Sequence, residues 1–214
     1  MPFYQLGDEI VFPAPQLAGA EGLLAVGGDL TFDRLLLAYQ NGIFPWYEEG
    51  SPILWWAPDP RFVLFPEEIR ISKSMRQVLK KQLFTFTINK DFEAVIEACQ
   101  NISRNGQDAT WITDEMKEAY IDLHRKGWGY SVEVWQNAEL VGGLYGVLVG
   151  KVFCGESMFT RTSNASKAAL IFWAEKLQKA GVELIDCQVH SDHLESMGAR
   201  YISLENYLEI LRGV

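Results

Sequence analysis

Residues 151–193 read KVFCGESMFTRTSNASKAALIFWAEKLQKAGVELIDCQVHSDH, and their pattern of apolar and polar residues predicts a strand, a loop, a helix and a second strand. The first strand, over 152–159, would carry one row of side chains on a single face: Val152, Cys154, Glu156 and Met158. The second strand, over 184–189, would place Asp186 and Gln188 together on one face. Buried strand faces rarely hold such groups unless partners or ligands satisfy them, so we expect a functional site here.

The helix between these strands is expected over about 164–180, with Ser163 or Asn164 as its cap and Gly181 as its stop. Upstream, alternating residues predict three further strands, over 84–88, 130–135 and 140–149. Successive strands with short connections pair in an antiparallel way. We therefore predict an α+β fold with a mostly antiparallel central sheet.

The chain has 214 residues, of which 48% are hydrophobic, and a formal net charge of -9. This composition is that of a globular protein, and the charge argues against nonspecific coating of nucleic acid while leaving room for a local basic face. Three cysteines without a CxxC motif suggest reduced thiols. The sequence shows no basic leader and no apolar run of about 18 residues, so we expect a cytoplasmic protein that makes no membrane contact.

Prolines and tryptophans are concentrated between residues 42 and 61. Such a segment forms either the core of a small domain or a surface on which a ring stacks, and the sequence leaves both interpretations open. The Pro-Asp-Pro sequence at 58–60 is the best candidate for a domain boundary. We therefore predict a small N-terminal domain over 1–60 and a larger domain, which carries the site, over 61–214.

A basic segment occupies residues 70–81, where five basic residues occur without an acidic one. A helix that begins after Ser72 would carry three of them on one side, Lys73, Arg76 and Lys80, with Lys81 directly after it. A solvated helix face is one interpretation. Because the rest of the chain is acidic, a docking surface for the phosphates of a nucleic acid is the other.

Several common catalytic arrangements are missing from the sequence. His190 and His193 form a close pair without a third ligand at a recognisable spacing, so we predict no metal site. There is no GxSxG motif, and neither Cys154 nor Cys187 has an obvious base. The polar residues of the two strands remain, and they could orient an amine and accept its proton or form a structural network: Glu156, Asp186 and Gln188.

Eight segments of the chain carry a further signal: GLLAVGGDL, LLLAYQNGIFPW, ILWWAPDPR, TWIT, VGGLYGV, FCGESMF, SNASKAAL and LIDCQV. In this order, and over about residues 22 to 200, they resemble the leucyl/phenylalanyl-tRNA-protein transferase family. The resemblance implies a small N-terminal domain and a C-terminal domain of the N-acetyltransferase (GNAT) type. It implies transfer of Leu or Phe, with Met as a further candidate, from aminoacyl-tRNA to the α-amino group of proteins that begin with Arg or Lys, which marks them for degradation. It implies no cofactor, and we expect a monomer.

The resemblance also implies roles for individual residues. Asp186 and Gln188 would orient the acceptor amine and help to deprotonate it, and Glu156 would hold the α-ammonium group of the donor amino acid. Eight residues would form the aminoacyl pocket and the adenine stack, with plain core packing as the alternative for each: Trp46, Trp111, Leu144, Phe153, Met158, Leu170, Trp173 and Ile185. The basic helix would dock tRNA through Lys73, Arg76, Lys80 and Lys81.

Two other functions compete with this one. An N-acetyltransferase that uses acetyl-CoA would need a glycine-rich pyrophosphate loop before the long helix, where this chain has RTSNAS at 161–166. A non-enzymatic adaptor for basic N-termini would need neither the polar residues of the two strands nor an apolar donor pocket.

Overall fold

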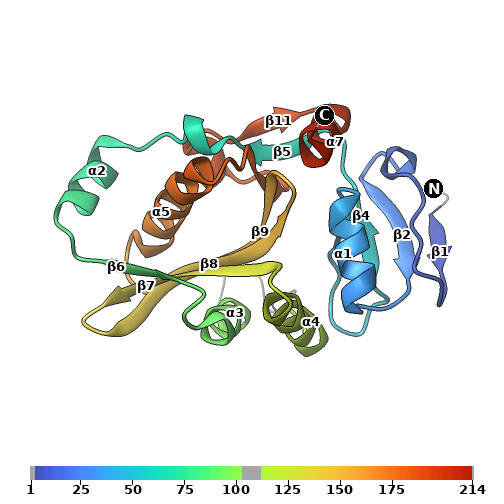
Figure 1. The fold of residues 1–214 in the computed structure, drawn as a ribbon, viewed down its shortest axis with the longest axis horizontal. Helices are drawn as coiled ribbons and strands as arrows, with labels where there is room; N and C mark the ends of the chain where they lie inside the picture. The colour runs from blue at the N-terminus through green and yellow to red at the C-terminus, as the bar shows by residue number, and fades with distance from the viewer. Residues whose placement is uncertain (1–2, 103–111, 214) are drawn as a thin grey trace.

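The computed structural model describes residues 3–102 and 112–213 and contains two sheets of unequal size (Figure 1). The smaller sheet has four strands in the order β1-β2-β4-β3. Its strands are β1 (Tyr4–Leu6), β2 (Leu23–Gly27), β3 (Phe44–Pro45) and β4 (Leu54–Trp56). Trp55 is fully buried in this part of the chain, whereas 42% of Trp46 is exposed. The tryptophan-rich segment therefore supplies both core and surface.

The larger sheet has seven strands in the order β11-β5-β10-β9-β8-β7-β6. Its strands are β5 (Arg61–Leu64), β6 (Thr85–Ile88), β7 (Gly129–Gln136), β8 (Glu139–Val149), β9 (Val152–Thr160), β10 (Leu184–Gln188) and β11 (Arg200–Ile202). Strands β9 and β10 run parallel, since helix α5 (Ala165–Lys179) connects them, and the other neighbours are antiparallel. The predicted α+β fold with a mostly antiparallel sheet is confirmed.

Helices cover both faces of the larger sheet (Figure 1). Helix α5 packs on one face, in a cluster of buried apolar side chains that includes Leu144, Phe153 and Ile185. A second buried cluster on the other face joins strand residues to α1 (Phe32–Gln40), α3 (Phe92–Asn101), α4 (Asp114–Arg125) and α7 (Leu204–Arg212). This second cluster also contains Leu24 and Trp55 of the smaller sheet, so the two sheets share a core and the domain boundary at residue 60 stays a prediction.

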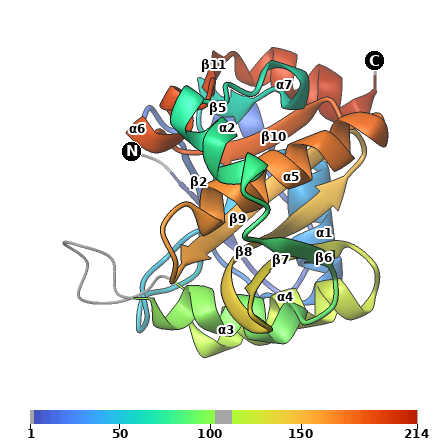
Figure 2. The same ribbon diagram turned by 90° about the vertical axis from the view of Figure 1, so that its left-hand side faces the viewer.

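Two further α-helices are α2 (Lys73–Lys80) and α6 (Asp192–Ser196). Figure 2 shows α2 on the same side of the molecule as α5. Ser72 accepts a hydrogen bond from the Met75 amide at 3.1 Å and caps α2 as predicted. Asn164 stands at the cap position of α5, but its side chain makes no capping hydrogen bond. No helix within 3–102 and 112–213 is long and apolar enough to cross a membrane.

A bulge interrupts the ladder between β8 and β9 at the predicted site. Tyr145 pairs with Ser157, but the next residue, Gly146, pairs with Gly155. Glu156 is therefore an extra residue in β9 with no counterpart in β8. The bulge frees this side chain from the regular alternation of the strand.

The bulge also changes which side chains share a face of β9. Cys154 belongs to the buried cluster with α7, whereas Met158 packs against the cluster with α5. The predicted single row of Val152, Cys154, Glu156 and Met158 is therefore wrong. Alternation assumes an uninterrupted ladder, and one inserted residue exchanges the two faces of the strand beyond it.

Gly146 allows the two strands to approach at this bulge, and we predict that it tolerates no side chain. A Cβ atom at Gly146 would lie 2.1 Å from the carbonyl oxygen of Cys154, which belongs to the backbone and cannot turn aside. Gly146→Ala should lower the free energy of unfolding by about 3 kcal/mol, which lowers Tm by roughly 10 °C in a chain of this size. Thermal denaturation followed by circular dichroism measures the change.

Gly7→Ala is the matched control, because no atom lies within 4 Å of a Cβ added there. Its Tm should equal that of the wild type. A Gly146→Ala variant as stable as this control would contradict the close approach of β8 and β9.

Candidate functional site

A cavity of about 590 Å³ opens between residues 44–46, which include β3, and strands β8, β9 and β10. The segment 189–194, which leads into α6, provides part of its remaining wall. Nine residues predicted from the sequence line this one cavity: Trp46, Leu144, Phe153, Glu156, Met158, Leu170, Ile185, Asp186 and Gln188. Residues that are far apart in the chain are thus brought together at one place.

One predicted pocket residue that the structure describes, Trp173, does not line this cavity. Trp173 lies one layer further inside, where its ring meets the ring of Phe153 in a T-shaped contact with centroids 5.3 Å apart. It is 5% exposed, and its indole N–H has no hydrogen-bond partner among the described residues. Trp173 therefore supports the cavity wall from behind. Trp111 lies outside the described residues.

Two tyrosines hold the carboxylate of Glu156. Tyr39 donates its hydroxyl to Oε1 at 2.7 Å, and Tyr120 donates to Oε2 at 3.0 Å. Burial raises the pKa of both tyrosines well above its ordinary value, so both remain protonated donors. Burial also raises the pKa of Glu156 from 4.5 to about 7, although the two hydrogen bonds oppose this. Glu156 can therefore exchange a proton near neutral pH.

Asp186 is fully buried, and donors occupy both of its oxygens. Oδ1 accepts hydrogen bonds from Arg61 Nε at 2.8 Å and from the backbone N–H of Gln188 at 2.9 Å. Oδ2 accepts from Arg61 Nη2 at 2.7 Å and from the hydroxyl of Tyr207 at 2.9 Å. The carboxylate thus has no free side from which to contact a substrate amine directly.

Gln188 connects the two carboxylates. Its backbone N–H is bound to Asp186, and its side-chain Nε2 donates to Glu156 Oε1 at 3.2 Å. The predicted trio therefore forms one network at the cavity wall, in which protein donors occupy the carboxylate oxygens of Asp186.

The sequence interpretation missed four members of this network: Tyr39, Arg61, Tyr120 and Tyr207. Arg61 opens a strand whose other residues are all apolar, and an arginine in such a strand was a usable signal of a buried partner. The tyrosines lie on the buried faces of α1, α4 and α7. A buried tyrosine hydroxyl usually has a partner, but the sequence does not say which one.

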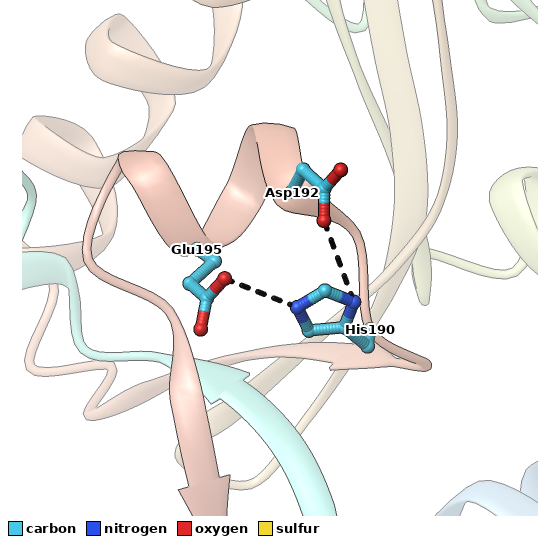
Figure 3. A group of neighbouring side chains, drawn as sticks. All are labelled: His190, Asp192 and Glu195. Carbon is cyan, nitrogen blue, oxygen red and sulfur yellow. Dashed lines mark hydrogen bonds and ion pairs between the residues drawn. The ribbon is translucent and has the colours of Figure 1, made fainter.

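His190 stands at the cavity wall beside two exposed carboxylates (Figure 3). Its Nδ1 lies 4.0 Å from Asp192 Oδ1, and its Nε2 lies 3.2 Å from Glu195 Oε2. The two ring nitrogens thus face different carboxylates, and one ligand atom from each of the three side chains lies within 4.8 Å of the others. His193, the other member of the pair noted in the sequence, is not part of this group. The absence of a metal site stays a prediction.

The basic residues of α2 and of its C-terminal cap are exposed to solvent: Lys73, Arg76, Lys80 and Lys81. The helix is anchored by Met75, which is 5% exposed. Among the described residues, no salt bridge involves any of these four cations. Helix α2 lies at the end of the molecule opposite the smaller sheet (Figure 1), and its positive charge is free to meet a polyanion.

The raised pKa of Glu156 predicts a pH-dependent cost to stability. The group titrates near pH 7 in the folded protein and near 4.5 in the unfolded chain. As the pH rises from 4.5 to 7, the unfolded state loses its proton first, so the folded state becomes less stable, by about 3 kcal/mol in total. Glu156→Gln removes this term. The Tm of the variant minus that of the wild type should therefore rise between pH 5 and pH 8, as measured by calorimetry, and a constant difference would contradict the raised pKa.

Solved structures resemble this fold in part. An aminoglycoside acetyltransferase, meta-AAC0020 from an uncultured soil metagenomic sample, matches with a TM-score of 0.41 at 13% identity, over 53% of this chain and 83% of its own. A GCN5-related N-acetyltransferase from Kribbella flavida matches with a TM-score of 0.40 at 11% identity, over 77% of this chain and 58% of its own. Because these TM-scores are low, the fold is defined by its own strand order and not by these structures.

Sequence relatives are much closer. A leucyl/phenylalanyl-tRNA–protein transferase of Syntrophus aciditrophicus (strain SB) is 58% identical over 212 residues, which cover 99% of this chain and 89% of the relative. One of Flavobacterium johnsoniae is 56% identical over 209 residues, which cover 98% of this chain and 99% of the relative.

Two family models match successive parts of the chain. The model described as leucyl/phenylalanyl-tRNA protein transferase matches residues 63–212, and the model of its N-terminal domain matches residues 28–59. The resemblance noted in the sequence is thereby confirmed. Because these models and the nearly full-length relatives agree, the chain belongs to the leucyl/phenylalanyl-tRNA–protein transferase family.

Proposed function

We propose that this protein transfers Leu or Phe, with Met as a further candidate, from aminoacyl-tRNA to the N-terminal α-amino group of proteins that begin with Arg or Lys, and so marks them for degradation. Family membership supports the transfer of Leu or Phe to protein N-termini. The observation that carries the chemistry is the position of Glu156 and Gln188, joined by a hydrogen bond, in the wall of an apolar cavity.

The proposed reaction is the aminolysis of an ester. The nitrogen of the acceptor amine attacks the ester carbon of the aminoacyl group, a C–N bond forms, and the C–O bond to the terminal ribose of the tRNA breaks. One proton leaves the attacking nitrogen, and one reaches the departing ribose oxygen. Gln188 orients the acceptor amine, with Asp186 acting through it, and Glu156 in its ionised form holds the α-ammonium group of the donor. Both substrates are thereby oriented before bonds change.

The donor side chain would occupy the apolar part of the cavity. Its apolar side chains include Leu144, Phe153, Met158, Leu170 and Ile185. Such a surface accepts Leu, Phe or Met without a polar contact. Because an apolar slot discriminates a missing methylene by only about 1–3 kcal/mol, small differences in packing would set the preference among the three.

The tRNA would dock on α2. Exposed cations in an otherwise acidic protein focus a negatively charged partner on one region, and contacts with phosphates are the usual role of such a cluster. We further propose that the protein acts in the cytoplasm as a monomer and without a cofactor.

Two rival functions are less well supported. An acetyl-CoA-dependent N-acetyltransferase needs a pyrophosphate loop, but residues 161–166 contain no glycine. A non-enzymatic adaptor for basic N-termini does not require an apolar cavity beside a network of carboxylates. The aminoacyl transfer uses both features.

The first test is transfer itself. Labelled Leu or Phe should pass from charged tRNA to a peptide that begins with Arg, and ribonuclease should abolish the transfer. A peptide of the same sequence with an acetylated N-terminus is the control and should stay unlabelled. Gln188→Ala should slow the transfer roughly 10-fold or more, because orientation of the amine is lost. Transfer that survives ribonuclease, or labelling from acetyl-CoA, would overturn the proposal.

The second test concerns α2. Changing Lys73, Arg76 and Lys80 to Ala should weaken tRNA binding and reduce the slope of log affinity against log salt by about 2 to 3, since each phosphate contact releases counterions. A matched control changes three exposed lysines elsewhere, Lys90, Lys126 and Lys151, and alters the net charge equally. Binding measured by fluorescence anisotropy at several salt concentrations separates the two. The same slope in both triple variants would rule out docking on α2.

A further inference from the structure

Arg61 is the most deeply buried cation near the site. It begins β5, and 1% of its surface is exposed. Its guanidinium lies between the rings of Phe44 and Tyr207, 4.6 Å and 4.8 Å from their centroids. Aromatic faces attract a cation but do not replace its lost hydration, so a group buried in this way also needs an anionic partner.

The anionic partner is Asp186 on the neighbouring strand β10. Two parallel hydrogen bonds, 2.8 Å and 2.7 Å long, join the guanidinium to the two carboxylate oxygens. Burial alone would lower the pKa of Arg61, but the adjacent Asp186 raises it above its usual value, so the guanidinium remains charged. A bidentate contact fixes the plane of the carboxylate as well as its position.

The fixed carboxylate in turn holds the backbone of Gln188. Oδ1 of Asp186 accepts the Gln188 N–H at the point where the pairing of β10 with β5 shifts register. Gln188 has a φ of 56°, in the left-handed region that L side chains disfavour. Such a conformation persists only when its surroundings hold it. From this backbone the Gln188 amide reaches Glu156 at the cavity.

We propose that Arg61 is a positioning residue of the transfer reaction. Arg61 holds the carboxylate of Asp186, and Asp186 fixes the backbone of Gln188. The side-chain amide of Gln188 is thereby directed toward Glu156. This inference rests on the proposed function and deepens it. It assigns to Arg61 an effect on the rate of transfer beyond any effect on folding, although Arg61 touches no substrate.

Arg61→Lys tests this, because lysine keeps the charge but cannot make the two parallel bonds. We expect kcat to fall about 10-fold or more, with KM for aminoacyl-tRNA within about twofold of the wild type, since the donor pocket is intact. Arg34→Lys is the matched control: Arg34 is also fully buried, but it binds Asp29 and two backbone carbonyls near the N-terminus. Arg34→Lys should lower Tm and leave kcat unchanged. An equal loss of kcat in the two variants would overturn the proposal.

A double-mutant cycle with Gln188→Ala separates positioning from a general structural effect. If Arg61 acts through Gln188, Arg61→Lys should slow transfer less than about twofold in a protein that already carries Gln188→Ala. The same fold loss in both backgrounds would mean that Arg61 acts by another route, and the proposal would fail.

Hydrogen exchange at the backbone N–H of Gln188 tests the positioning without any substrate. Arg61→Lys should speed this exchange about 10-fold or more by weakening the bond to Asp186, and unchanged exchange would overturn the proposal.

If Arg61→Lys does not fold, Tyr207→Phe removes a single hydrogen bond to Asp186. This variant should speed exchange and lower kcat, each by less than Arg61→Lys would. A wild type that transfers neither Leu nor Phe refutes the proposed function, whereas normal transfer by Arg61→Lys refutes this inference alone.

Discussion

Arg61 and Asp186 form a bidentate ion pair between β5 and β10, and neither side chain reaches solvent. Removing one member of such a pair leaves a buried charge without compensation, at a cost of about 3–5 kcal/mol. Through its neighbours the pair also joins separate parts of the chain, because Phe44 comes from the N-terminal region and Tyr207 from α7. Phe44 and Asp186 also line the cavity, so this buried contact lies directly behind its wall.

The regular parts of the fold could be predicted from the sequence, because periodicity reports local structure. The strands of the central meander, helix α5 and the strand that returns beside β9 lie where alternation and helical spacing place them. Two of the register shifts, one at residues 155–157 of β9 and one at residues 186–188 of β10, could not be predicted in this way, since an inserted residue leaves no periodic signal. Glu156 and Gln188 both lie at these irregularities. The site thus lies where the regular alternation of the strands is interrupted.

Part of the candidate site could also be predicted from local sequence. Its apolar lining and its three polar residues lie in short segments that the family shares, so local similarity was enough to find them. Trp173 contacts Phe153, which lines the cavity, but does not line it itself, and sequence spacing on α5 does not reveal this arrangement. The partners of the carboxylates come from distant segments, and no local pattern connects Tyr39 or Tyr120 with Glu156.

Helix α7 is the last part of the hydrogen-bond network to be synthesised. Tyr207 is translated after every other member of the network, yet its hydroxyl completes the coordination of Asp186. A nascent chain that has emerged only as far as β10 could therefore pair Arg61 with Asp186 but would leave one acceptor site of a buried carboxylate unfilled. Folding from the N-terminus during translation would then finish at the site last. The growing polypeptide would gain a fully assembled network only when α7 had left the ribosome.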